Sequence, residues 1–398
     1  QDLGRSGLPF QLGCSMTGGI AKADSSLAVL PFDRAEFRRR VSRVLAEMAD
    51  RGADLLLVDQ IDSLAYLTGY AHSGARYQGA LISLLGDVTL LIRSADQFGA
   101  QRQATVDAFV TFDDHEDETA LLAGLIRDSG TKTLAIETDS HFLTIERYER
   151  VQAVNPGLKF IDFGKVIWEH RLIKSPAEIE ALRRACAIAD AAIQAGTDAI
   201  ALGRSEREPA IATYRKAISL GADNGRVAVF GYGSTVANMH GRLGERIMQA
   251  GELYFIEAVP QVYGYSGRIA RPMAVGHVSD RQRAIAQRVV EIQDEFIAAM
   301  VPGAISGEID RVARETMLRE GLKKTYPQVS AYTLGYHAAP RTSDHTRIFM
   351  PNETWALEPN MVFHVIHYCE GMPFSETVLV TQNGPLRLTQ AAREIAVR

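Results

Sequence analysis

The sequence predicts an α+β protein with two domains, an α/β domain followed by one in which helices precede antiparallel strands. Three observations support this class. The chain has 398 residues, too many for one ordinary hydrophobic core. Its first part alternates apolar strands with amphipathic helices. Its second part opens with a long helix after Ser175 and becomes rich in strands after residue 330.

The first predicted domain spans residues 31–168 and follows a Gly/Ser-rich arm, residues 1–30, that we expect to be flexible. Apolar residues at helical spacing alternate with short apolar runs, and Gly86-Asp87 predicts a hairpin turn. The expected helices cover about 33–50, 61–69, 116–129 and 142–154, and the expected strands 54–58, 80–85, 88–92, 109–112, 133–137 and 159–163.

The second predicted domain, residues 169–398, begins at a clear helix start. Ser175 can cap the helix, Pro176 needs no N–H partner there, and Glu178 completes a capping box. The expected helices cover about 175–199, 206–218, 280–300 and 306–320, and the expected strands 226–230, 331–336, 361–367 and 374–381, together with the hairpin at 251–272.

The hairpin carries the most informative charged residues. Its apolar first strand ends on Glu257, and its return strand carries Arg268 and Arg271. A buried acid costs free energy unless it is paired or used in chemistry. The residues therefore leave two interpretations open, a structural ion pair with one of the arginines or an active-site hairpin.

Composition excludes several classes of protein. The net charge is −5, and basic tracts with interleaved aromatic residues are missing, so we expect no nucleic-acid partner. Three scattered cysteines form no CxxC pair, so a disulfide framework or thiolate zinc site is not expected. No apolar run is long enough to span a membrane, and the start of the chain does not read as a signal peptide. We expect a cytoplasmic protein.

Several motifs occur in a family-specific order. They are Tyr66-Leu-Thr-Gly69, Arg171-xx-Lys174-Ser175-Pro176-x-Glu178, Gly251-Glu252, Pro302-Gly303 and Leu357-Glu-Pro-Asn-Met-Val362. Together they resemble the prolidase/creatinase family with the pita-bread fold, over about residues 34–390. The resemblance implies a creatinase-like N-terminal domain, a pita-bread catalytic domain, and a homodimer in which the partner's N-terminal domain closes the active site.

Peptidases of this family hold two metal ions with two aspartates, a histidine and two glutamates. The resemblance places the four carboxylate positions at Glu257, Arg268, Ile366 and Ser375 and the histidine position near residues 334–337. Arginine does not deprotonate to serve as a ligand, and isoleucine has no donor atom. We therefore expect the metal site to be lost and no cofactor to be needed.

Loss of the metals leaves a metal-free hydrolase or a catalytically dead binding protein. Within the family the chain resembles ectoine hydrolase and creatinase, which implies hydrolysis of a non-peptide C–N bond, amide or amidine, in a small polar substrate that bears a carboxylate. A creatinase-like amidinohydrolase is a further alternative. Histidines near the expected cleft favour catalysis; they are His240, His337, His345 and His364.

We assign catalytic roles to four residues. Glu257 is the nucleophile or general base, His240 moves protons, and His364 lies two residues before Ile366 on the same strand face. Arg268 or Arg271 binds a substrate carboxylate or stabilises developing negative charge in place of the metal. The predicted substrate-binding residues are Arg76, Tyr77, Arg271, His337, His345 and Glu376, of which the first two lie on a loop that reaches into the partner's site in creatinase-like dimers.

Overall fold

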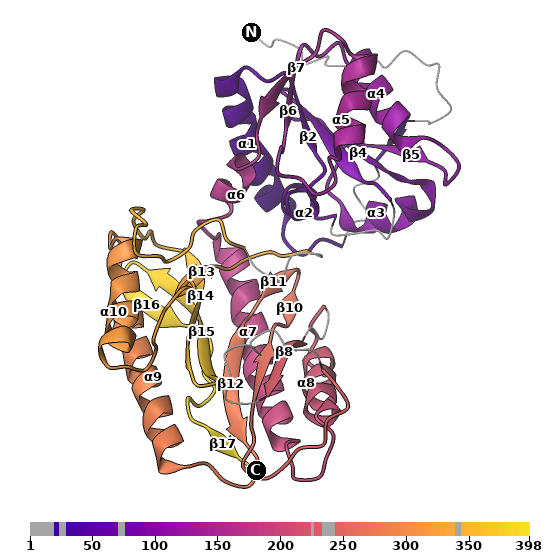
Figure 1. Ribbon diagram of the computed structural model, residues 1–398. Coiled ribbons are helices and arrows are strands. Elements are labelled where there is room, and N and C mark those ends of the chain that lie inside the picture. The colour runs from indigo at the N-terminus through magenta and orange to yellow at the C-terminus, as the bar shows by residue number, and fades with distance from the viewer. Residues whose placement is uncertain (1–19, 24–28, 71–75, 224–226, 233–242, 339–343) are drawn as a thin grey trace. The chain divides into compact units, whose positions relative to one another are not determined.

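The fold was analysed on a computed structural model that describes residues 20–23, 29–70, 76–223, 227–232, 243–338 and 344–398 (Figure 1). The chain divides into two compact units, one ending at His170 and the other beginning at Arg171. Predicted residue His240 lies outside the described residues. In the part of the chain that is described, no helix combines the length and apolar character needed to cross a bilayer.

The first unit is built on a mixed sheet. Its described strands follow the order β1-β5-β4-β3-β2-β6-β7 and are β1 (Ile20–Lys22), β2 (Leu55–Val58), β3 (Gly79–Ser83), β4 (Val88–Arg93), β5 (Ala108–Phe112), β6 (Thr133–Ile136) and β7 (Lys159–Asp162). Its helices are α1 (Arg34–Arg51), α2 (Ile61–Thr68), the 3₁₀ turn η2 (Ser94–Asp96), α3 (Gln97–Gln103), α4 (Glu118–Asp128), α5 (Ile145–Val154) and α6 (Val166–His170).

Local sequence explains the ends of these elements. The Asp33 carboxylate accepts a hydrogen bond from the Glu36 N–H and starts α1, and Gly52, at φ 69°, ends it. One part of the expectation was wrong. Residues 20–22 of the predicted flexible arm form β1, because the edge of β5 offers free backbone groups and Ile20 pairs with Val110.

The second unit is built on a sheet with the path β13-β14-β15-β12-β9-β8, among the described residues. Its strands are β8 (Val227–Tyr232), β9 (Leu253–Ala258), β10 (Gln261–Val262), β11 (Tyr265–Ser266), β12 (Ile269–Ala274), β13 (Ala331–Thr333), β14 (Val362–Cys369), β15 (Met372–Thr381), β16 (Gly384–Arg387) and β17 (Ala396–Val397). Its helices are α7 (Pro176–Asp198), α8 (Arg207–Ser219), α9 (Asp280–Ala298) and α10 (Ser306–Arg319) (Figure 1). The predicted capping box at Ser175 and Glu178 is confirmed.

Two hydrophobic clusters bury one face of this sheet. Ile256 of β9 packs in a cluster with the α7 alanines, and Val365 of β14 packs in a cluster with Phe296 of α9. Strand pairing puts both side chains on the same face. Ile256 is paired with Arg271 and Val365 with Glu376. Arg271 and Glu376 each follow a residue of the pair Ala270 and Ser375, so they point to the same side of the sheet. The helices therefore cover this face, and alternate residues of the strands point to the other.

Candidate functional site

The face of the sheet opposite the helices carries the predicted catalytic residues Glu257 and His364, and we call it the Glu257 face. Glu257 pairs with Ala270, Ala270 with Ser375, and Ser375 with Ile366 across four neighbouring strands. Directly paired residues point to the same side of an antiparallel sheet. His364 lies two residues before Ile366 and therefore shares this face. One register brings together side chains that are more than 100 residues apart in the chain.

Glu257 is held by a buried arginine. The Arg268 Nε donates to Glu257 Oε1 at 2.5 Å, and the two residues are 6% and 4% exposed. Thr377 fixes the arginine backbone, since its Oγ1 accepts from the Arg268 N–H at 3.0 Å and donates to the Arg268 carbonyl at 2.9 Å. Burial works to lower the pKa of Arg268, but the charges of Glu257 and Tyr332 and the hydrogen bond to Glu257 together outweigh burial and raise that pKa. The Arg268 guanidinium is therefore charged.

His364 stands beside this ion pair. Its Nδ1 lies 2.7 Å from the Tyr332 hydroxyl, and its Nε2 lies 3.7 Å from Glu257 Oε1. Burial, followed by the charges of Arg268 and His345, holds the pKa of His364 well below its usual value. The imidazole is therefore neutral at physiological pH. His345 itself is exposed, and its ring meets the Tyr332 ring edge-on at 4.6 Å.

A second buried group surrounds His337. Burial lowers the pKa of His337, and burial also lowers the pKa of Lys174 to about 8. Burial works to raise the pKa of Asp344, but the charges of Arg171 and Lys174, together with smaller contributions that include a hydrogen bond from Thr346, lower it. The Asp344 carboxylate also accepts from Thr346 N–H at 2.8 Å. His337 is thus a neutral imidazole close to a charged Asp344, and its ring nitrogens lack hydrogen-bond partners among the described residues.

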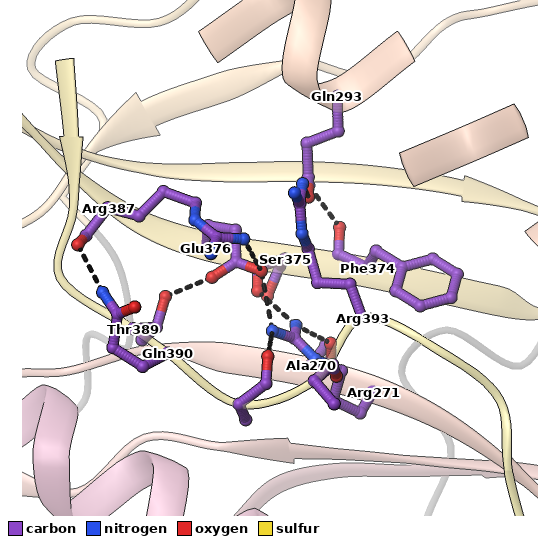
Figure 2. Close-up of polar contacts among 12 residues, drawn as sticks. Ala270, Arg271, Gln293, Phe374, Ser375, Glu376, Arg387, Thr389, Gln390 and Arg393 are labelled. Atoms are coloured by element: carbon purple, nitrogen blue, oxygen red, sulfur yellow. Dashed lines mark hydrogen bonds and ion pairs between the residues drawn. The ribbon is translucent and has the colours of Figure 1, made fainter. Parts of the chain in front are cut away.

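Two predicted substrate-binding residues lie on the opposite face of the sheet from Glu257. Arg271 and Glu376 lie on the helix-covered face, one residue out of phase with Ala270 and Ser375 (Figure 2). The five Arg271 N–H groups have protein acceptors, which are Glu376 Oε1 and the carbonyls of Ala270, Ser375, Ala391 and Ala392. Glu376 also accepts from Thr389 Oγ1. This geometry corrects the prediction, because the pair clamps the C-terminal segment and has no donor left for a substrate.

The other two predicted binding residues belong to the first unit. Tyr77 is 1% exposed, its hydroxyl lies 3.2 Å from Asp59 Oδ2, and the Arg147 guanidinium stands 3.9 Å from its ring centroid. Tyr77 is therefore part of that unit's interior, which corrects the prediction of a substrate clamp. Arg76 is exposed and donates to Glu118 Oε2 at 3.1 Å. A binding role for Arg76 stays a prediction.

The sequence interpretation missed Tyr332 and Thr377 as site residues. Thr377 lies two residues after Ser375 on β15, so the two-residue period of a strand could have placed it on the Glu257 face. Tyr332 lies on β13, and its pairing with His364 depends on a contact between segments 32 residues apart. No local pattern in the sequence indicates that register.

A pair of divalent metal ions does not fit the Glu257 face. The positions at which the family resemblance places carboxylate ligands hold Glu257, Arg268, Ile366 and Ser375. A cation placed beside Glu257 would meet the buried guanidinium already bonded to that carboxylate. Within the described ranges, no group of three or more His, Cys, Asp or Glu side chains could hold a metal. The chemistry considered below therefore uses the chain's own side chains.

Comparison with known proteins places the two units in one family. The model of metallopeptidase family M24 matches residues 180–382, and the creatinase/prolidase N-terminal domain model matches residues 40–173. The chain belongs to metallopeptidase family M24. The Xaa-Pro dipeptidase of Pyrococcus furiosus is 26% identical over 90% of this chain and 99% of its own length. The ectoine hydrolase of Halomonas elongata is 24% identical over 93% of this chain and 99% of its own length.

Comparison with solved structures confirms the expected fold. The prolidase of Pyrococcus horikoshii superimposes with a TM-score of 0.77 over 90% of this chain and 99% of its own, at 23% sequence identity. The protein is therefore α+β, with a creatinase-like N-terminal domain and a pita-bread C-terminal domain, as predicted. At this identity the structural match bears on the fold alone.

The comparisons contradict the predicted reaction. A hydrolase of non-peptide C–N bonds was expected, with a small-molecule binding protein or a creatinase-like amidinohydrolase as alternatives. The relatives instead include Xaa-Pro dipeptidases from two Pyrococcus species and from Lactobacillus helveticus, at 26–27% identity over 88–90% of this chain. The ectoine hydrolase match has a lower identity, 24%. The prediction rested on a few motif residues near the site, whereas the dipeptidase relatives have the higher sequence identity.

Proposed function

We propose that this M24 protein hydrolyses the peptide bond of a dipeptide-sized substrate on the Glu257 face, with Xaa-Pro dipeptides as the first candidates. The dipeptidase relatives, which match along nearly the whole chain, support the type of bond. One observation carries the choice of site, the buried Glu257 carboxylate held at 2.5 Å by Arg268 with a neutral imidazole at 3.7 Å.

The proposed chemistry needs no metal ion. Glu257 accepts a proton from water as the water oxygen bonds to the carbonyl carbon. The Arg268 guanidinium stabilises the negative charge that develops on the carbonyl oxygen, the task that a metal ion serves elsewhere. The C–N bond then breaks, and the proton held on Glu257 passes to the leaving nitrogen. Arg268 also orients the Glu257 carboxylate through the hydrogen bond from its Nε.

We also propose a homodimer, on the strength of the family resemblance, in which the partner's first unit closes the site. The exposed Arg76 is the residue of that unit that we assign to the contact with substrate. Sedimentation equilibrium tests whether the protein is a dimer. An unchanged KM in an Arg76→Ala variant would show that Arg76 does not bind the substrate. A cytoplasmic location stays a prediction.

The test is a dipeptide hydrolysis assay on the purified protein. A panel of Xaa-Pro and non-proline dipeptides is incubated with EDTA or with Mn²⁺, and released amino acids are quantified. We expect turnover of at least one dipeptide at equal rates in both conditions. Activity that disappears with EDTA and returns with Mn²⁺ would refute the metal-free chemistry. Binding of dipeptides without release of amino acids would refute the hydrolase.

The sheet offers a matched pair of variants for this assay. Glu257 and Glu376 are both buried carboxylates paired with an arginine of the β12 region, on opposite faces. Glu257→Gln should lower kcat by about 10²-fold or more, because it removes the base. Glu376→Gln should leave the kcat of the folded protein unchanged. Equal losses in the two variants would show that a damaged sheet, rather than a lost base, lowers activity.

A further inference from the structure

We infer that Tyr332 is a positioning residue that sets the tautomer of His364, so that His364 directs an Nε2–H toward Glu257 and acts there as a hydrogen-bond donor. The geometric part of this inference stands on the contacts of the three side chains. Its catalytic part rests on the proposed function, because it assigns His364 the task of donating to a substrate bound at Glu257.

The backbone register brings the two rings together. Tyr332 of β13 is paired directly with His364 of β14, so both side chains point to the Glu257 face. The tyrosine hydroxyl lies 2.7 Å from His364 Nδ1, and the ring centroids are 5.0 Å apart. His364 has no exposed surface, and Tyr332 is 7% exposed. A hydrogen bond in such a dry setting is stronger than one exposed to water.

Two tautomers of the neutral ring are possible, and the surroundings distinguish them. If the Tyr332 hydroxyl donates to Nδ1, the imidazole proton sits on Nε2 and faces Glu257 Oε1 at 3.7 Å. If Nδ1–H donates to the tyrosine oxygen instead, the Nε2 lone pair faces a carboxylate oxygen. Like partial charges repel at that distance, and the buried site does not screen them. The first tautomer is therefore favoured.

The tyrosine ring is itself held in place. The Arg268 guanidinium carbon lies 5.6 Å from its centroid, and the exposed His345 ring meets it edge-on at 4.6 Å. Removing only the hydroxyl, in Tyr332→Phe, leaves these ring contacts available. Tyr326 provides a matched control, because it is also 7% exposed in the same unit, and its hydroxyl accepts from Ser330 Oγ at 3.4 Å.

The test reads the tautomer directly by NMR of ¹⁵N-histidine-labelled protein. His364 signals are assigned as those absent from the His364→Gln spectrum. We expect Nε2 protonated and Nδ1 unprotonated in the wild type, and a shift toward the other tautomer in Tyr332→Phe. Tyr326→Phe should leave the His364 signals unchanged. Wild-type protein with Nδ1 protonated, or a Tyr332→Phe spectrum identical to wild type at His364, would overturn the inference.

Kinetics of the same variants test the catalytic part. Tyr332→Phe should lower kcat by about tenfold or more with little change in KM, because a mispositioned proton affects the transition state more than substrate binding. An unchanged kcat beside a changed tautomer would refute the catalytic role. If the wild type hydrolyses no dipeptide, the proposed function fails, while the NMR result still decides the positioning role of Tyr332.

Discussion

The buried pair between Arg271 and Glu376 provides a sharp test of the assignment of the two sheet faces. In Glu376→Gln the side chain keeps its size and loses its charge. The wild-type carboxylate has no exposed surface, accepts from Arg271 Nη2 at 2.7 Å, and lies 3.8 Å from Arg387 Nη1. Arg271 also donates to the carbonyls of Ala391 and Ala392. The variant thus leaves a buried guanidinium without its counter-charge.

Removing one partner of a fully buried ion pair costs about 3–5 kcal/mol of stability. For a domain of this size, each kcal/mol lowers the melting temperature by about 2–4 °C, so we expect Tm to fall by roughly 6–20 °C. The C-terminal segment should also loosen. Asp190 accepts from the N–H groups of Gln390 and Ala391, and we expect faster hydrogen exchange there in the variant.

Thermal unfolding and hydrogen exchange of the wild type, Glu376→Gln and a control measure these effects. Glu370→Gln is the control, because Glu370 also pairs with an arginine, Arg281, in an exposed setting. Its Tm should stay within about 2 °C of wild type, since exposed pairs contribute little. A Glu376→Gln variant as stable as that control would refute the clamp. Loss of activity in fully folded Glu376→Gln would show that Glu376 does contribute to the substrate site.

Three further predictions concern other parts of the second unit. Burial lowers the pKa of His367 to about 3. As pH falls, the unfolded chain therefore binds a proton at this histidine before the folded protein does. The contribution of neutral His367 to the free energy of unfolding is full above about pH 6.5 and declines as pH falls toward 3. His367→Phe, beside Phe296, should weaken this acid sensitivity in unfolding curves recorded from pH 7 to pH 4. The triple variant Arg268→Asp, Ile366→Glu, Ser375→Glu should bind Mn²⁺ in titration calorimetry, whereas the wild type should not; equal binding by both would refute the mismatch with metal. Ser175→Ala should cost about 1 kcal/mol in urea unfolding by breaking the capping box, and an unchanged midpoint would contradict that role.

Strand and helix positions were largely predictable because they depend on local periodicity. The predicted hairpin appears as β9 and β12, and the predicted helix starting after Ser175 appears as α7. The site was less predictable. From the sequence, either Arg268 or Arg271 could be the ion-pair partner of Glu257. In the structure the partner is Arg268, whose Nε donates to the Glu257 carboxylate. Arg271 lies three positions later in the chain, and strand alternation turns it to the other face.

The sequence by itself determined the fold class, the family resemblance and the loss of metal-ligand residue types at Arg268 and Ile366, because residue identity and short-range pattern carry that information. Only the tertiary structure decided which charged residues meet. It places Glu257 in contact with Arg268 and Tyr332 in contact with His364, and it pairs Glu376 with Arg271 on the opposite face of the sheet. The physical reason is that strand register sets both neighbour and face, and register arises from long-range pairing that no single segment encodes.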